Sequence, residues 1–161
     1  MIPDSHGPLP SNGRILLVTS SGGHLIQLQA LRQWWEGHDR LWVSFDTPDV
    51  RSALGDERLI TAYHPTTRNL RNLVRNTLLA FRTLRSERPD VVISTGAGVA
   101  VPFFWLARAL GIGTVYLEVF DRIESPTLTG RLCYPVADAF LVQWDSQLPF
   151  YPGAVNVGQV L

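Results

Sequence analysis

Two short glycine-rich stretches contain the residues best suited to bind a phosphate group. The first, Ser20-Ser21-Gly22-Gly23-His24, follows the apolar run 14–19. Glycines let backbone amides come close to an anion, and a helix that begins at His24 directs its positive end to the same place. His24 is therefore a candidate base or phosphate contact. A tight strand-to-helix turn with a solvent-facing histidine explains the same residues equally well.

The second stretch, Thr95-Gly96-Ala97-Gly98, follows the apolar run 91–94. It lacks the third glycine of a dinucleotide-binding fingerprint, because Val101 occupies that position. Close packing of a helix on a strand would also account for these glycines. Two such turns on one edge of a sheet indicate an anion site more strongly than either turn alone.

Glu118 is the third candidate, because it directly follows the apolar run 114–117. A carboxylate at the end of a strand can bind a substrate hydroxyl or act as a general base. It could equally cap a neighbouring helix or pair with Arg122. We take His24 and Glu118 as the candidate catalytic residues.

The segment 68–88 is strongly basic, with six arginines and one glutamate in a chain whose net charge is zero. At about 100° per residue, five of these arginines share one helix face. They are Arg68, Arg71, Arg75, Arg82 and Arg85. We predict that this face contacts an anionic membrane surface or lipid head group, with a solvated helix face as the alternative. The opposite face, expected against the sheet, carries Leu70, Leu73, Val74, Phe81 and Leu84.

Composition excludes several classes of protein. The zero net charge of the 161 residues gives no general attraction to nucleic acid. The single cysteine, Cys133, rules out an internal disulfide, and no cluster has metal-ligand spacing, so we expect no metal and no cofactor. Residues 1–13 have no apolar core typical of a signal peptide and are interpreted as a flexible leader. No apolar run is long enough to span a membrane, which favours peripheral attachment.

Strands and helices alternate along the chain, which predicts an α/β, Rossmann-like domain with helices on both faces of a parallel sheet. We assign residues 14–158 to this domain and 159–161 to a tail. Ligands of such sheets bind beyond the carboxyl ends of the strands, so 20–24, 95–98 and 118–124 should share the functional edge. The predicted strands are 14–19, 41–45, 59–62, 91–94, 114–117 and 139–142. The predicted helices are 24–35, 49–54, 70–87, 99–110 and 128–136.

Several motifs, in this order, resemble those of the bacterial PssD-type polysaccharide biosynthesis family. They are Ser20-Ser21-Gly22-Gly23-His24, Pro65-Thr66-Thr67-Arg68-Asn69, Pro89 to Gly98, Leu128-Thr129-Gly130-Arg131 and Gln143-Trp144. That family is similar to the membrane-associated subunit of the two-chain transferase that adds the second N-acetylglucosamine to a dolichol-diphosphate sugar. Both resemble the N-terminal half of MurG-type transferases.

The resemblance implies the N-terminal half of a GT-B glycosyltransferase that needs no metal and uses a UDP-sugar as donor. This half would bind a lipid-diphosphate-linked sugar acceptor at the cytoplasmic face of the membrane, in capsular or exopolysaccharide synthesis. A separate chain, similar to the C-terminal half, would hold most of the UDP-sugar, and the tail could cross to it. The two glycine turns, Ser20–Gly23 and Thr95–Gly98, would bind the acceptor diphosphate.

Two other functions remain open on the sequence alone. A small dinucleotide-binding oxidoreductase domain would explain why an acid, Asp46 or Glu118, follows each glycine turn at about the required interval. A non-catalytic membrane-surface adaptor would make the arginine-rich helix the whole function.

Overall fold

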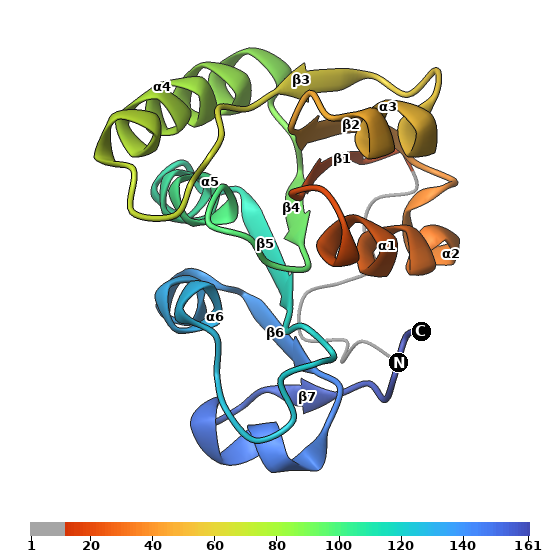
Figure 1. Ribbon diagram of the computed structural model, residues 1–161, viewed down its shortest axis with the longest axis vertical. Helices are drawn as coiled ribbons and strands as arrows, with labels where there is room; N and C mark the ends of the chain where they lie inside the picture. The colour runs from red at the N-terminus through yellow and green to blue at the C-terminus, as the bar shows by residue number, and fades with distance from the viewer. Residues whose placement is uncertain (1–11) are drawn as a thin grey trace.

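The computed structural model describes residues 12–161, so nearly all of the predicted leader lies outside the described residues. Seven parallel strands form one sheet in the order β3-β2-β1-β4-β5-β6-β7 (Figure 1). The strands are β1 Arg14–Val18, β2 Asp39–Ser44, β3 Leu59–Thr61, β4 Val91–Ser94, β5 Gly113–Leu117, β6 Ala139–Val142 and β7 Val155–Asn156. The predicted α/β, Rossmann-like architecture is confirmed.

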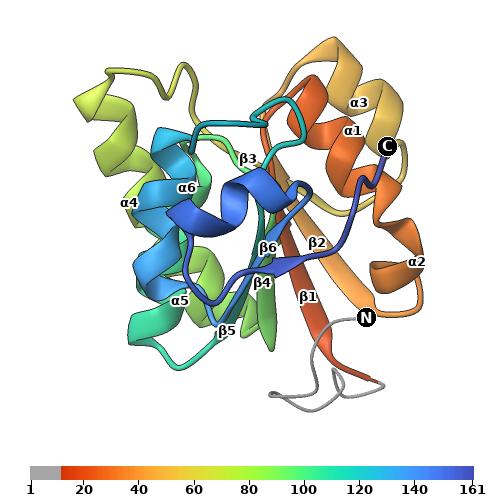
Figure 2. The same ribbon diagram turned by 90° about the horizontal axis from the view of Figure 1, so that it is seen from below.

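Helices cover both faces of the sheet, as Figure 2 shows, with α1 to α3 on one side and α4 to α6 on the other. The helices are α1 Gly23–Ala30, α2 Arg32–Trp35, α3 Pro48–Leu54, α4 Leu70–Glu87, α5 Ala100–Ala109 and α6 Leu128–Cys133, with short 3₁₀ turns η1 Tyr134–Val136 and η2 Asp145–Phe150. Alternate residues of β1 serve the two faces, because Leu16 packs in one core cluster and Leu17 in the other. Both faces of the strand are therefore buried under helices, which explains why the strands are continuous apolar runs.

Two details differ from the sequence-based prediction. The single helix predicted for 24–35 is divided at Leu31, whose backbone leaves the helical region. The bend buries both Leu31 and Trp35, and the indole of Trp35 donates to the carbonyl of Leu28. The strand β7 and the turn η2 were not predicted, since two residues of strand give no readable period.

The predicted packing of α4 is wrong in an informative way. Of the five apolar residues expected against the sheet, only Leu84 is buried, and the others are exposed: Leu70, Leu73, Val74 and Phe81. The buried face is instead largely polar or small, and consists of Asn72, Asn76, Ala80, Thr83 and Leu84. Two asparagine amides on this face bond to the backbone of the preceding loop, which satisfies them without water. The apolar stripe is left on the outside, next to the arginines.

The tail lies against its own domain. Val157 and Val160 pack on the cluster shared with α1 and α2, and the amide of Val160 donates to the side chain of Gln143 at 3.1 Å. The predicted crossing of residues 157–161 to a partner stays a prediction.

Candidate functional site

The two glycine turns lie side by side, because β1 and β4 are neighbours in the sheet and run in the same direction. His24 and Thr95 join them through two hydrogen bonds. The Nδ1 atom of His24 lies 3.0 Å from the carbonyl oxygen of Thr95, and the Thr95 hydroxyl donates to the carbonyl of His24 at 2.7 Å. The predicted adjacency of the turns is therefore confirmed.

This contact fixes the tautomer of His24. A carbonyl oxygen only accepts hydrogen bonds, so Nδ1 carries the hydrogen and Nε2 of the neutral ring is free to accept a proton. Gly96 makes room for the ring: its φ is +116°, and a Cβ atom there would lie 2.9 Å from Cε1 of His24. Any larger residue at this position would push the imidazole away, so the turn holds a base in one orientation.

An open cleft of about 500 Å³ lies over the two turns. None of the described residues that line it is an arginine, an aspartate or a glutamate. The lining combines hydroxyls with two histidines and aromatic rings: Ser20, Ser21, His24, Phe45, Thr47, His64, Pro65, Thr66, Thr67, Ala97, Gly98, Tyr116, Thr127 and Thr129. Phe45 and His64 pack together, with ring centroids 5.0 Å apart. A neutral cleft rich in hydroxyls suits a polyhydroxylated ligand.

The first turn differs from the predicted diphosphate cradle. Gly22 and Gly23 are exposed and do not line the cleft. The amide of Gly22 donates to the carboxylate of Asp49 at 2.9 Å, so a group of this chain already occupies one of the expected anion contacts. Of the second turn, Ala97 and Gly98 line the cleft, whereas Thr95 and Gly96 support it from below.

Glu118 is fully buried and does not line the cleft. Its carboxylate accepts hydrogen bonds from the Thr127 hydroxyl at 2.9 Å, from the Val119 amide at 3.1 Å and from the Tyr151 hydroxyl. Thr127 is the N-cap of α6 and stands between Glu118 and the cleft. This geometry is close to the helix-capping alternative, and of the two predicted bases only His24 faces the open space.

The buried carboxylate also affects its neighbours. Burial, reinforced by the charge of Glu118, raises the pKa of the Cys133 thiol to about 12. The same two causes, in the same order, raise the pKa of Tyr116 well above its ordinary value. Both groups are therefore protonated at any physiological pH.

The sequence reasoning missed most of the cleft wall. Thr66 and Thr129 had entered only as parts of motifs, and Thr127, Phe45 and His64 had not been singled out at all. Tyr116 lies inside an apolar strand, where its hydroxyl gave no signal of a site.

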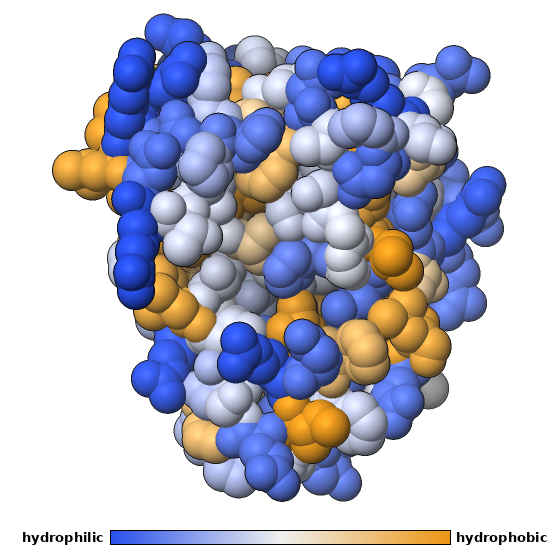
Figure 3. Space-filling model, in the orientation of Figure 1, coloured by the Kyte–Doolittle hydropathy of each residue, from blue (hydrophilic) through white to orange (hydrophobic). Residues whose placement is uncertain are grey.

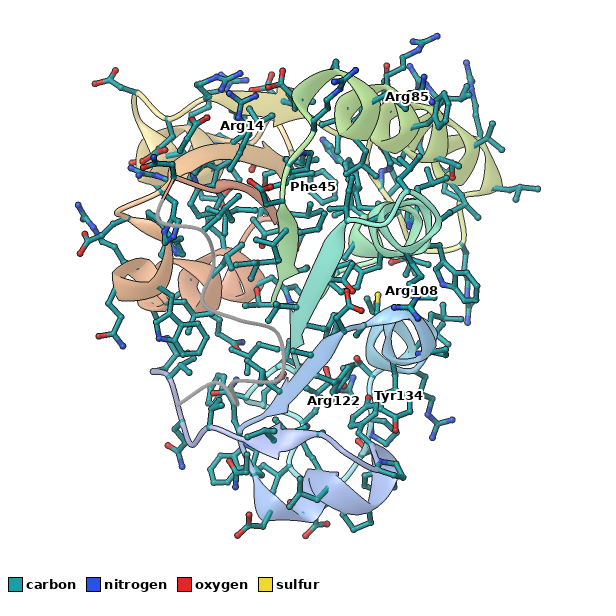
Figure 4. All side chains as sticks on the ribbon, turned by 180° about the vertical axis from the view of Figure 1, so that it is seen from behind. Arg14, Phe45, Arg85, Arg108, Arg122 and Tyr134 are labelled. Carbon is teal, nitrogen blue, oxygen red and sulfur yellow. The ribbon has the colours of Figure 1, made fainter. Side chains whose placement is uncertain are left out.

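The arginines of α4 form a second surface. Arg71, Arg75, Arg82 and Arg85 lie on α4, whereas Arg68 precedes the helix with a φ of +50°, so the predicted sharing of one helix face is wrong for Arg68. All five side chains are exposed, and none forms an ion pair within residues 12–161. Arg75 stacks over the ring of Tyr63 at 3.8 Å, and Arg85, labelled in Figure 4, lies on α4 beside the ring of Phe81. Basic and apolar side chains stand together over this helix in Figure 3. Within the described part of the chain, no helix has the length and apolarity needed to cross a membrane.

Metal ligands are not gathered anywhere in the described residues: no group of three or more His, Cys, Asp or Glu side chains could hold an ion.

Comparison with known proteins identifies the relatives. The family model described as "Oligosaccharide biosynthesis protein Alg14 like" matches residues 61–160. The human UDP-N-acetylglucosamine transferase subunit ALG14 is 26% identical over 91% of this chain and 82% of its own length. The subunit of the same name from Eremothecium gossypii is 41% identical, over 47% of this chain and 39% of its own length.

Solved structures share the fold. Acinetobacter baumannii MurG superimposes with a TM-score of 0.71 at 19% identity, over 91% of this chain and 44% of MurG. The UDP-N-acetylglucosamine 2-epimerase of Rickettsia bellii gives a TM-score of 0.72 at 11% identity, over 92% of this chain and 45% of the epimerase. The chain thus spans less than half the length of these structures and corresponds to one of the two halves of a GT-B-like fold.

These comparisons confirm the predicted class, a glycosyltransferase, and the likeness to MurG. The relatives named are eukaryotic subunits, so the narrower PssD-type assignment is not shown. With its family model covering 100 of 161 residues, the chain belongs to the Alg14-like family of oligosaccharide biosynthesis proteins.

Proposed function

We propose that this chain is the acceptor-binding subunit of a two-chain transferase that moves N-acetylglucosamine from its UDP-linked form to a lipid-diphosphate-linked sugar. The observation that carries the proposal is His24, which Thr95 holds through Nδ1 and which lines an open cleft rich in hydroxyls. The curated relatives named above, which are subunits of a UDP-N-acetylglucosamine transferase, support the choice of donor.

In the proposed reaction a hydroxyl of the acceptor sugar attacks the anomeric carbon of the donor sugar. His24 accepts the hydroxyl proton at Nε2 as the new C–O bond forms, and UDP leaves as the C–O bond to its phosphate breaks. Residues 12–161 form a single sheet domain and leave the cleft open, and ligand sites of this kind usually lie between domains. A partner similar to the C-terminal half of a GT-B enzyme would close the cleft and bind most of the UDP-sugar.

The acceptor has a natural path along the structure. Its sugar would occupy the cleft, whose rim includes Thr66 and Thr67, and the next residue is the exposed Arg68 at the entrance to α4. The diphosphate would lie near Arg68, Arg71 and Arg75, outside the neutral cleft. The lipid would follow the exposed apolar stripe of α4 into the membrane, with the domain held peripherally at the cytoplasmic face.

The biological setting follows from the acceptor. The curated relatives favour the assembly of a lipid-linked oligosaccharide over the capsular or exopolysaccharide setting that the PssD-type motifs indicate. The two settings are separated by offering the complex a dolichyl-type and an undecaprenyl-type diphosphate sugar. We further propose that transfer needs no metal or cofactor, so EDTA should leave the rate unchanged.

The test is transfer of labelled N-acetylglucosamine from its UDP form to phytanyl-diphosphate-N-acetylglucosamine by the chain co-expressed with its partner. We expect the His24→Ala variant to lose about 100-fold or more of kcat. His38→Ala is the matched control, because His38 lies immediately before β2 and does not line the cleft, and the variant should keep the full rate.

Three results would overturn the proposal. Full activity of the isolated chain would remove the need for a partner. A His24→Ala complex with an unchanged rate, combined with loss of function when the α4 arginines are reversed, would favour the adaptor. Stabilisation by NADH and not by UDP compounds would favour the oxidoreductase.

A further inference from the structure

Tyr116 of β5 is fully buried in the middle of the sheet, yet its hydroxyl has no hydrogen-bond partner among residues 12–161. The ring is held firmly, stacked on Phe140 with centroids 4.8 Å apart and edge-on to Phe104 at 5.7 Å. Burial keeps the phenol protonated by raising its pKa, so the group is a permanent donor. A buried polar group without a partner costs folding free energy, and such an exception calls for a functional explanation.

The neighbouring polar groups do not satisfy this hydroxyl. The Thr127 hydroxyl nearby donates to Glu118 and accepts from the amide of Gly130 at 2.8 Å, and no hydrogen bond of good geometry joins it to Tyr116. The carboxylate of Glu118 takes its phenolic hydrogen bond from Tyr151 instead. Two tyrosines thus lie near one carboxylate, and only Tyr151 is paired with it.

The unpaired hydroxyl lies at the floor of the cleft, beside the histidine. Tyr116 is one of the cleft-lining residues, its ring is packed in the core, and its hydroxyl oxygen is itself buried just beneath the cleft floor. A Cβ atom placed on Gly96 would lie 3.3 Å from the Tyr116 oxygen and 2.9 Å from Cε1 of His24, so both side chains approach Gly96 closely. The phenol and the imidazole therefore border the same point above Gly96.

The chemistry of the cleft indicates which ligand atom would accept this hydrogen bond. The described lining has no arginine to neutralise a phosphate and seven serine or threonine residues that suit hydroxyl groups. We infer that the Tyr116 hydroxyl donates to a hydroxyl oxygen of the neutral acceptor sugar and positions that sugar beside Nε2 of His24. This inference rests on the proposed function and adds a residue that sets the orientation of the sugar.

Tyr116→Phe is the direct test, because it removes one oxygen and leaves the ring. In the complex with the partner chain, we expect KM for phytanyl-diphosphate-N-acetylglucosamine to rise about 5- to 10-fold, with kcat within about twofold. Since the hydroxyl has no partner in the free protein, the melting temperature should be unchanged or higher. Tyr151→Phe is the matched control: it breaks the bond to Glu118 and should lower the melting temperature.

A structural role for the hydroxyl would give the opposite pattern. A Tyr116→Phe variant that melts below the wild type, as Tyr151→Phe should, would overturn the inference, and so would an unchanged KM. If the wild-type complex transfers no sugar, the proposed function fails, and the role of Tyr116 is read from binding by the full chain. Weaker binding of free N-acetylglucosamine by Tyr116→Phe, measured by NMR titration, would then support it. Absence of sugar binding by the wild type, or weakened binding of inorganic pyrophosphate, would reject it.

Discussion

Gly130 touches Glu118 so closely that a Cβ atom at this position would overlap Oε2 of the carboxylate and lie 2.9 Å from the hydroxyl of Thr127. The glycine, the buried acid and the N-cap of α6 therefore form one compact unit behind the cleft. This unit fixes Thr127, which contributes to the cleft wall.

Gly130→Ala should destabilise the fold, since the added methyl meets a buried carboxylate and the hydroxyl of Tyr151 instead of a flexible surface group. We expect the free energy of unfolding to fall by about 2–3 kcal/mol, measured by urea denaturation. Gly37→Ala is the control, because a Cβ atom there would meet nothing within 4 Å, and it should change stability by less than about 0.5 kcal/mol. Equal stability of the two variants would contradict the tight packing.

Glu118→Gln separates a positioning role from a catalytic one. The carboxylate accepts hydrogen bonds from Thr127, Val119 and Tyr151. In glutamine an NH2 group replaces one of the two accepting oxygens, so its hydrogens would face groups that are themselves donors. We expect a loss of about 2 kcal/mol in the free energy of unfolding, with kcat of the folded complex reduced by less than about tenfold. A loss of kcat of about 1,000-fold with unchanged stability would restore Glu118 as the base.

Cys133 should give the fold a pH dependence at alkaline pH. Its pKa is about 12 in the folded chain against 9.0 for a free thiol, with burial as the main cause. Below pH 9 the thiol is protonated in both states; between pH 9 and 12 the unfolded chain loses its proton first, so stability falls as pH rises. Urea denaturation across this range should show a shallower decline for Cys133→Ala than for the wild type. An identical decline in the two proteins would exclude the thiol as its source.

We expect the exposed arginines of α4 to bind anionic lipid vesicles. Reversing Arg71, Arg75 and Arg82 to glutamate should weaken binding to phosphatidylserine-containing vesicles by at least about 100-fold, since each basic residue near an anionic surface contributes about 1 kcal/mol. The melting temperature should fall only slightly, because the three side chains are exposed and form no ion pair within the described range, and only the stacking of Arg75 on Tyr63 is lost. Glutamates at Arg32, Arg51 and Arg108, which are exposed on other helices, give a control of equal charge that should still bind.

The order of strands and helices and the place of the cleft could be predicted from the sequence. Buried parallel strands have continuous apolar runs, and the turns at 20–24 and 95–98 mark the edge where ligands bind. The joining of His24 to Thr95 follows from that topology.

The orientation of individual side chains could not be predicted in the same way. The inward face of α4 depends on Asn72 and Asn76, whose amides find backbone partners at Pro65 and Tyr63 only in the folded chain. Glu118 is at the expected strand end, but its direction is set by Tyr151, which lies 33 residues away. In both cases a hydrogen bond formed only in the folded chain orients the side chain, and hydrophobicity and spacing do not predict that bond.

The asparagine bonds of α4 link two parts of the molecule mechanically. Asn76 exchanges two hydrogen bonds of 2.9 Å with the backbone of Tyr63, and Asn72 donates to the carbonyl of Pro65, immediately before the cleft-lining Thr66. Three hydrogen bonds therefore tie the outer helix to the cleft rim. A bilayer bound to the outside of α4 would therefore set the distance and tilt of the cleft relative to the lipid. The depth of insertion would then determine which sugar of a lipid-linked acceptor reaches His24.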